Sequence, residues 1–327
     1  TRTLQPNWLD YTVHRFPYMP CSKMEFIAEA TMKNASSLVT ACPPAYLASA
    51  YIKIIQTPAK LIHTHLALPL GILAAANPRK TPQLITCHGS DITYPIEKPV
   101  FVPITRRTLR KADHIATVSE YIRNYAIQLG AKPEKTETIY LGVDTDRFKP
   151  KKQTEIKTIG TLGRLVPEKN IDELLYAVKL LEDKTDFQLL IGGDGPDKHR
   201  LMRLASKLSV EAEFTGRVYD QVSFHQRLDV FVLTSRREGL SISLQEAMSS
   251  GVIPVAVDGL GCNEIISNQV NGYLYEAGDH EMLAQRILDA IDNPHLGRKA
   301  RKTKVQRFNS KHSAQRYLEL YRELGIS

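Results

Sequence analysis

Short apolar runs alternate along this chain with longer amphipathic stretches. The alternation is typical of parallel β-sheets covered by helices, because a strand buried on both faces reads as a continuous apolar run. It predicts strands at residues 37–40, 60–64, 83–87, 114–118 and 136–139, and again at 157–162, 187–191, 213–215, 230–233, 253–257 and 272–275. We therefore expect an α/β protein.

The length of 327 residues allows two such domains, since single hydrophobic cores usually stop growing at roughly 250 residues. Residues 141–155 (LGVDTDRFKPKKQTE) are rich in Gly, Pro and charge and lack apolar periodicity, as interdomain connections do. We place a boundary near residue 150, with one Rossmann-like domain at residues 1–150 and another at 151–327. A final amphipathic helix at residues 313–324 is expected to pack back on the first domain.

Composition argues against several protein classes. No apolar run approaches the ~20 residues of a membrane-spanning helix. The four cysteines stand singly, without the spacing of a zinc site or the density of a disulfide scaffold. These features predict a cytoplasmic protein.

Charge is unevenly distributed, with +7 in residues 1–150, −6 in 151–296 and +7 in 297–327. A predicted helix at residues 103–112 carries Arg106, Arg107, Arg110 and Lys111. Such a face suits an anionic surface, and peripheral docking at the inner face of the cytoplasmic membrane is one hypothesis. Ordinary solvation is the alternative. Nucleic acid is not expected as a partner, because no helix-turn-helix, RNA-binding or zinc-finger pattern occurs.

The segment EGLSISLQEAMSSG, residues 238–251, is the strongest candidate for a functional site. Glu238 follows the predicted strand at 230–233, and the carboxyl ends of strands are where open α/β sheets bind ligands. Ser241 or Ser243 is placed to cap a helix that follows. The free N–H groups from Leu240 onward then suit a phosphate or diphosphate.

Two carboxylates flank this helix start, and they suit sugar hydroxyls better than phosphate. Glu238 and Glu246 could each hold one sugar on either side of the anion site. The alternative is that Glu238 interacts with the helix dipole and Glu246 is a solvated helix residue.

Basic residues occupy the loop after the predicted strand at 157–162. Arg164 and Lys169 lie five positions apart, where a guanidinium and an ammonium can converge on a diphosphate. A surface salt bridge is the alternative role. Residues 192–195 (GGDG) resemble a phosphate loop in composition, but they lack its spacing and a tight turn explains them equally well.

Histidines form the remaining polar candidates. His88 ends the predicted strand at 83–87 and, if the two halves face one another, could hydrogen-bond a reacting sugar; a structural histidine is the alternative. His63 and His65 have no nearby Cys, Asp or Glu in the sequence, so no catalytic metal is predicted.

Several motifs together resemble one enzyme family. Glu238 and Glu246 are separated by seven residues, as in that family. Six further motifs stand in the family's order: HGSD at 88, RKADHIATVSEY at 110, IYLGVDTDRF at 139, GRLVPEK at 163, GDGP at 193 and NGYLYEAGD at 271. From about residue 60 onward the chain resembles the retaining GT-B glycosyltransferases of the glycosyl transferases group 1 (family 4) type. The resemblance implies a GT-B fold of two Rossmann-like domains that face a cleft.

The resemblance also implies roles and partners. The donor would be a nucleoside-diphosphate sugar and the acceptor a glycan or lipid-linked molecule, and a hexosyltransferase needing no metal or other cofactor is expected. The catalytic residues would be His88 at the transferred sugar, Arg164 and Lys169 at the diphosphate, and Glu238 at the sugar hydroxyls. The donor-binding residues would be Gly163, Val218 at the base, Leu240, Ser241, and Glu246 at the ribose.

Two departures from the family leave alternatives open. Such enzymes open with a strand and a glycine-rich loop, and nothing similar precedes Trp8, which predicts truncation at the amino terminus. Residues 259–264 (GLGCNE) lack the family's adjacent glycines and proline. A sugar-nucleotide epimerase of the same fold and a non-catalytic nucleotide-sugar-binding fragment therefore remain as alternatives. A Rossmann dehydrogenase is disfavoured, because no GxGxxG follows a strand with an acidic residue about 20 positions later.

Overall fold

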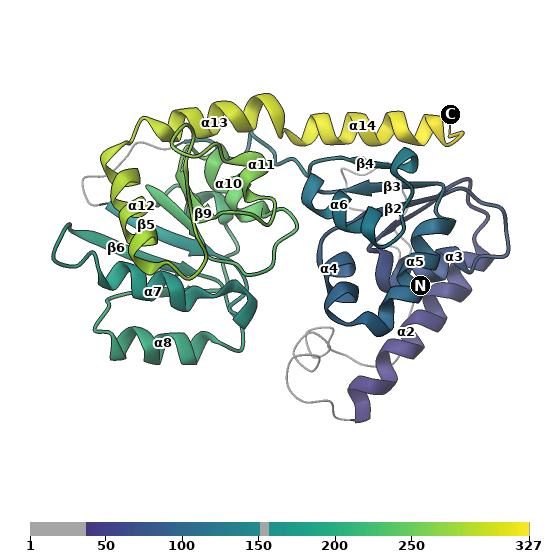
Figure 1. Ribbon diagram of the computed structural model, residues 1–327, viewed down its shortest axis with the longest axis horizontal. Helices are drawn as coiled ribbons and strands as arrows, with labels where there is room; N and C mark the ends of the chain where they lie inside the picture. Colours follow the sequence, from purple (N-terminus) through teal and green to yellow (C-terminus); the bar gives the residue numbers. More distant parts are fainter. Residues whose placement is uncertain (1–36, 151–156, 327) are drawn as a thin grey trace.

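Two parallel β-sheets dominate the computed structural model, which describes residues 37–150 and 157–326 (Figure 1). The first sheet has the order β1-β2-β3-β4, and its strands are β1 Ile62–His65, β2 Gln83–Cys87, β3 His114–Thr117 and β4 Thr136–Thr138. The second has the order β10-β9-β8-β5-β6-β7. Its strands are β5 Lys157–Leu162, β6 Phe187–Gly192, β7 Glu213–Gly216, β8 Val230–Leu233, β9 Ile253–Val257 and β10 Tyr273–Tyr275.

Helices connect the strands in both halves. Those of the first half are α2 Ser37–Gln56, α3 Ile72–Ala75, α4 Ser90–Glu97, α5 Val102–Lys111 and α6 Glu120–Gln128, with short turns η1 Ala67–Gly71, η2 Pro99–Phe101 and η3 Pro133–Lys135. Those of the second are η4 Pro167–Lys169, α7 Ile171–Lys179, α8 Lys198–Lys207, α9 Gln221–His225, α10 Ile242–Ser249, α11 Cys262–Ile265, α12 His280–Asp292 and α13 Leu296–Arg307. The chain ends with α14 Ser310–Glu323. No helix in the described ranges is both long and apolar enough to cross a membrane.

The second sheet buries both of its faces. Successive side chains of a strand point to opposite faces, and β8 shows this directly: Val230 and Val232 join the cluster that includes α7 and α12, whereas Phe231 and Leu233 join the cluster that includes α10. All of β8 is buried. The loop that follows β8 therefore starts from a rigid base.

The first sheet is covered by helices from two distant parts of the chain. Ile115 packs with Leu109 of α5 and Ile122 of α6. On the opposite face, Leu84 and Ala116 cluster with Leu320 of α14. Figure 1 shows α13 lying over the second half and α14 continuing over the first. The carboxyl-terminal helix thus belongs to the packing of the first sheet.

Polar side chains of α14 also bind the first half. Arg316 of α14 donates to both carboxylate oxygens of Glu137 on β4, at 2.8 and 2.9 Å. The Ser313 hydroxyl donates to the Tyr140 carbonyl at 2.6 Å. The helix is therefore attached to the first half by polar contacts as well as by Leu320.

The sequence located the strands well, with one error. The predictions at 83–87, 157–162, 230–233 and 253–257 coincide with β2, β5, β8 and β9, and the other predicted strands shift by one or two residues. The prediction at 37–40 is wrong, because these residues begin α2. Short apolar runs cannot be assigned to strand or helix by periodicity alone, and here the run continues into an alanine-rich stretch. Trp8, with its expected loop, and residues 151–156 lie outside the described residues.

The packing of α14 gives the first prediction. Leu320 is fully buried, so Leu320→Ala should lower the free energy of unfolding by about 2–5 kcal/mol through lost burial and the cavity left behind. Leu318 on the same helix is 50% exposed, and Leu318→Ala should change the free energy of unfolding by no more than about 0.5 kcal/mol. Urea unfolding followed by circular dichroism measures both. Equal effects would contradict the docking of α14.

Candidate functional site

The two halves meet where their strands end. The backbone at Gly239, in the loop after β8, lies directly against His88, which follows β2: a Cβ added to Gly239 would stand 1.9 Å from the His88 carbonyl oxygen. Ser119, which follows β3, donates its hydroxyl to the Gly239 carbonyl at 2.8 Å. Only glycine permits this approach, so the 238–251 segment touches the first half directly.

A carboxylate from the second half caps a helix of the first. Glu264 of α11 accepts hydrogen bonds from the backbone N–H groups of Glu120 and Tyr121, both at 2.8 Å. These donors lie in the first turn of α6, where a negative charge is favoured. Burial, and then the Glu264 carboxylate, raise the pKa of Tyr140. Arg237 and Glu97 form a further ion pair between the halves at 2.6 Å.

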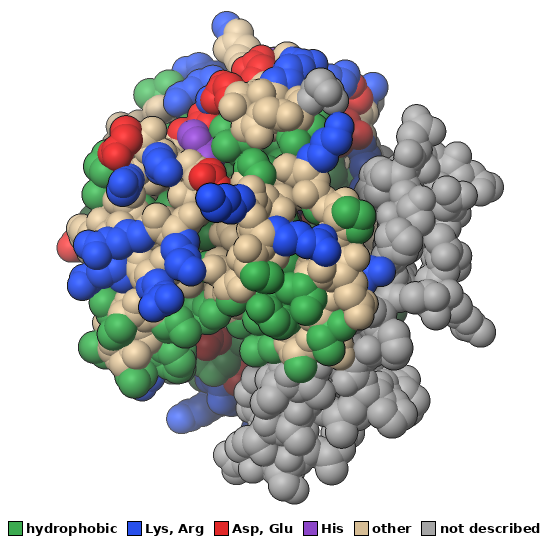
Figure 2. All heavy atoms as spheres, turned by 90° about the vertical axis from the view of Figure 1, so that its right-hand side faces the viewer, with side chains coloured by type: hydrophobic (Ala, Val, Ile, Leu, Met, Phe, Trp, Pro, Cys, Tyr) green, Lys and Arg blue, Asp and Glu red, His purple; other side chains and the backbone are tan. Residues whose placement is uncertain are grey.

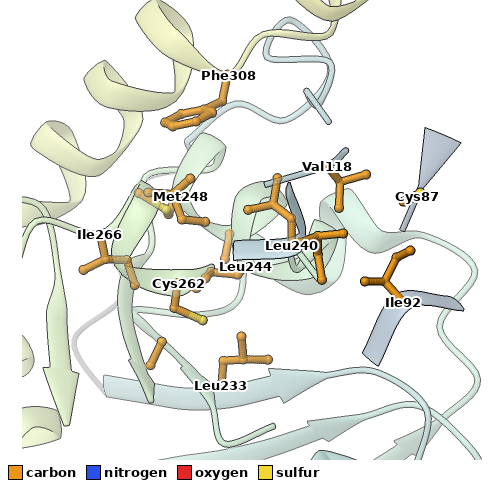
Figure 3. Packing of buried hydrophobic residues seen from close by; sticks show 14 of the residues in the cluster. Cys87, Ile92, Val118, Leu233, Leu240, Leu244, Met248, Cys262, Ile266 and Phe308 are labelled. Carbon is orange, nitrogen blue, oxygen red and sulfur yellow. The ribbon is translucent and has the colours of Figure 1, made fainter. Parts of the chain in front are cut away.

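The hydrophobic core also continues across this junction. Leu240 is 5% exposed and belongs to the same cluster as Val118 and Ile92 of the first half and Leu244 of α10. Figure 3 shows Leu240 between Leu244 and Val118. The loop that carries Glu238 is therefore held on both sides.

Glu238 is paired with a cation from the neighbouring loop. Its carboxylate accepts a hydrogen bond from Lys169 Nζ at 2.5 Å, and the two side chains are 17% and 27% exposed. The Thr234 hydroxyl donates to the Lys169 carbonyl at 2.8 Å. The loops after β5 and β8 are thus joined by this largely buried ion pair.

The start of α10 lies next to this pair. The sequence allowed either Ser241 or Ser243 as the cap of α10, and the structure shows that Ser241 is the cap. Its hydroxyl accepts from the Leu244 N–H at 3.3 Å, and Ser243 Oγ lies 3.3 Å from Ser241 Oγ. The first-turn N–H groups and the helix dipole make this end attractive to an anion.

Glu246, one turn further along α10, contacts a buried histidine. His225 Nε2 lies 3.3 Å from Glu246 Oε2, and the His225 side chain is fully buried. Within the described part of the chain, His225 Nδ1 has no hydrogen-bond partner. The Glu246 side chain is 16% exposed, so it is not the solvated helix residue of the alternative reading. No sequence pattern pointed to His225, which lies 21 positions away from Glu246.

The glycines after β5 and β6 pack against one another. A Cβ at Gly193 would stand 1.8 Å from the Gly163 carbonyl oxygen, and one at Gly195 would stand 2.3 Å from that of Leu165. This packing favours the tight-turn interpretation of GGDG. Arg164, in the loop after β5, is exposed. Val218, after β7, is partly buried against the hydrophobic cluster that both halves share.

His88 stands on a loop fixed by Asp91. Asp91 Oδ1 accepts from the His88 and Gly89 N–H groups at 3.0 and 2.9 Å, and Oδ2 accepts from the Ala67 N–H at 2.8 Å. The His88 ring lies beside His65, with Nε2 2.8 Å from His65 Nδ1. The sequence did not predict this pair, although the parallel register of β1 and β2 places His65 opposite Thr86, two residues before His88.

The structure therefore brings most of the predicted residues to one junction. His88 meets the Gly239 backbone, and Glu238 meets Lys169 beside the start of α10. No group of three or more His, Cys, Asp or Glu side chains arranged to hold a metal occurs among residues 37–150 and 157–326.

Comparisons with known proteins agree with this geometry. The sequence profile of the family Glycosyl transferases group 1 matches residues 142–307, and that of Glycosyltransferase Family 4 matches residues 35–147. The chain is 30% identical over 287 residues to a putative glycosyltransferase, EpsD, of Bacillus subtilis, covering 79% of this chain and 74% of that one. It is 27% identical to the alpha-monoglucosyldiacylglycerol synthase of Streptococcus pneumoniae, covering 82% and 67%.

Solved structures show the same fold. Sucrose-phosphate synthase of Thermosynechococcus elongatus superposes with a TM-score of 0.77 at 21% identity, covering 86% of this chain and 77% of that one. HepE of Anabaena, solved with UDP-glucose, also gives 0.77, at 22% identity and with 86% and 84% covered. The predicted GT-B fold is confirmed.

The close approach at Gly239 gives the second prediction. Gly239→Ala should separate the halves, because the new methyl group would overlap the His88 carbonyl. We expect a larger radius of gyration in small-angle X-ray scattering and a lower melting temperature.

Gly163→Ala is the matched control for Gly239→Ala. Its Cβ would meet only the flexible Lys169 side chain, at 3.7 Å, so it should leave the scattering curve unchanged. A Gly239→Ala curve that superposes on that of the unsubstituted protein would contradict the contact.

Proposed function

Because the chain belongs to the glycosyl transferases group 1 family and is a glycosyltransferase, we propose that it moves a hexose, with retention of configuration, from a nucleoside-diphosphate sugar to a glycan or lipid-linked acceptor. One observation carries the proposal. The Lys169–Glu238 pair, the amino end of α10 and His88 converge where the two sheets end.

The diphosphate would bind at the start of α10. The backbone N–H groups that follow Leu240 and the positive end of the helix dipole favour an anion there. Lys169 and Arg164, both in the loop after β5, would add charge-assisted hydrogen bonds. Gly163 leaves room for the donor beside this loop.

The two glutamates would grip the two sugars of the donor. Glu238 would accept from hydroxyls of the transferred hexose, with His88 on the other side, and Glu246 would accept from the ribose. The backbone at Val218 would contact the base. In the free protein Lys169 and Glu238 satisfy each other, so a donor would bring phosphate to the first and hydroxyl groups to the second.

The chain's residues would then stabilise departure of the nucleoside diphosphate. As the bond from the anomeric carbon to the phosphate oxygen breaks, Arg164, Lys169 and the α10 N–H groups would hold the developing charge, a preorganised form of catalysis. The acceptor oxygen would bond to the same face of the sugar and pass its proton to the departing phosphate oxygen. The step needs no protein nucleophile and no metal, so Glu238 acts as a positioning group.

Relatives favour particular classes of donor and acceptor. HepE was solved with UDP-glucose, and one relative is named alpha-monoglucosyldiacylglycerol synthase, so its printed product is a glucosylated lipid. We therefore propose a nucleotide-activated hexose as donor and a membrane lipid as one acceptor class.

Glu238→Ala gives the third prediction. It should lower turnover by about 10²–10³-fold, the cost of losing one group at a preorganised site, while nucleoside diphosphate binding is not weakened. Lys169→Ala should instead weaken nucleoside diphosphate binding by about 10–100-fold, because it removes a charged hydrogen-bond donor. UDP-glucose, UDP-N-acetylglucosamine and GDP-mannose are screened first by thermal shift, and calorimetry and product analysis follow.

Glu211→Ala, at an exposed position of the second half, is the control for this pair of variants and should behave as the unsubstituted protein. Transfer by Glu238→Ala at the unsubstituted rate would overturn its role. Products also separate the rivals: an epimerase releases nucleoside diphosphate or isomerised sugar without an acceptor, and a binding fragment releases neither.

We further propose that the first half docks on anionic membrane. Arg106, Arg107, Arg110 and Lys111 of α5 are all exposed. Val100, just before this helix, is 78% exposed, and Ile96, Phe101 and Ile104, close to it in the sequence, are also exposed. Figure 2 views the molecule from the right-hand side of Figure 1, where Lys and Arg side chains are spread above a group of hydrophobic ones. Basic and apolar groups together suit the headgroup region of a bilayer.

Membrane docking gives the fourth prediction. The chain should sediment with vesicles of phosphatidylglycerol and phosphatidylcholine but not with phosphatidylcholine alone. The double variant Arg107→Glu, Arg110→Glu should lose more than about tenfold in binding, since each basic group near the surface contributes ~1 kcal/mol. Arg203→Glu on α8, exposed in the second half, is the control. Binding that ignores lipid charge would count against docking.

A further inference from the structure

Three histidines, two on β1 and one directly after the neighbouring strand β2, form a continuous row in the first half. His63 and His65 of β1 stack with ring centroids 4.6 Å apart, and His65 stacks on His88 at 5.1 Å. His65 Nδ1 and His88 Nε2 are 2.8 Å apart, a hydrogen-bond distance. This histidine row ends at His88, which touches the second half.

The far end of the row is held by the carboxyl-terminal helix. His63 Nδ1 lies 2.7 Å from the Tyr321 hydroxyl, and His63 Nε2 lies 2.7 Å from Thr86 Oγ1. The Tyr317 hydroxyl lies 3.0 Å from the same Thr86 oxygen. Both ring nitrogens of His63 are therefore occupied, and its ring cannot turn without breaking two hydrogen bonds.

Burial disfavours a charge on every ring of the row. Burial, followed by repulsion from His65 and His88, lowers the pKa of His63 to about 4. Burial likewise lowers the pKa of His65. For His88, burial and His65 lower the pKa, and the Asp91 carboxylate opposes them. A neutral imidazole carries one donor and one acceptor nitrogen. The bond between His65 and His88 therefore couples their tautomers, because one of the two facing nitrogens must donate and the other must accept.

We propose that His65 is a positioning residue that sets the ring orientation and tautomer of His88, and that α14 braces it through His63. His88 Nε2 is engaged by His65, which leaves Nδ1 with the opposite hydrogen-bonding role. The inference rests on the proposed function only in assigning a sugar hydroxyl as the partner of Nδ1. A fixed tautomer offers that hydroxyl one defined hydrogen bond without a reorganisation cost.

The first test needs no ligand. Protein with ¹⁵N-labelled histidine rings is compared for His65→Phe, which keeps a ring but removes the nitrogens, and His65→Asn, whose amide can still hydrogen-bond near the Nδ1 position. Long-range ¹H–¹⁵N spectra should show one His88 tautomer in the unsubstituted protein and in His65→Asn, and a mixture in His65→Phe. An unchanged single tautomer in His65→Phe would overturn the proposal.

The second test uses turnover with UDP-glucose, UDP-N-acetylglucosamine or GDP-mannose, whichever is transferred fastest. His65→Phe should lower kcat by about 10–100-fold with UDP or GDP affinity unchanged, and His65→Asn should recover most of the loss. Tyr321→Phe, which removes only the hydroxyl at His63, should give a smaller loss of kcat. His312→Phe, at an exposed position of α14, is the control.

A His88→Ala variant separates the two possible failures. If it turns over as the unsubstituted protein does, the proposed sugar contact fails, and the tautomer spectra alone decide the positioning role. If His88→Ala loses turnover while His65→Phe keeps both kcat and the His88 tautomer, the positioning role fails and the proposed function stands.

Discussion

The approach of the His88 carbonyl to the Gly239 backbone is the constraint on which the site depends. A side chain at Gly239 has no room, and the Ser119 hydroxyl and Glu264 carboxylate complete the junction with hydrogen bonds to backbone groups. These contacts join the carboxyl ends of strands from both sheets, where parallel α/β folds place their ligand sites. This geometry explains the position of Glu238. It directly precedes the glycine that makes the contact, and β8 leads to the junction.

The return of the chain through α14 has a similar effect in the first half. Leu320 covers the outer face of the first sheet, and Arg316 fixes the helix to Glu137. The same helix carries Tyr321, which bonds to His63 at the start of the histidine row. A segment from the end of the sequence thus contributes both to the core of the first half and to the order of side chains that lead to His88. Stability and site geometry are here linked through one helix.

Much of this arrangement could be predicted from local sequence. Strands β5 and β8 appear as apolar runs, and Ser241 was one of the two serines expected to cap the helix after Glu238. The error at residues 37–40 arose because a short apolar run does not specify its backbone. The sequence could not show that Lys169 pairs with Glu238, that Glu264 caps α6, or that His65 meets His88. Those contacts depend on sheet order and strand register, which bring together residues that are between 23 and 144 positions apart.

The Lys169–Glu238 pair links this geometry to the proposed reaction. Both side chains are more than two-thirds buried, so leaving either charge without a partner costs more than it would at the open surface. A nucleoside diphosphate alone would draw Lys169 away and leave the Glu238 carboxylate uncompensated. A complete nucleotide sugar would supply hydroxyl donors to Glu238 at the same moment. On the proposed assignment the pair therefore favours binding of the intact donor over binding of its product, because only the donor offers a new partner to both Lys169 and Glu238. It would also favour release of the nucleoside diphosphate once the sugar has moved, since the pair can then re-form.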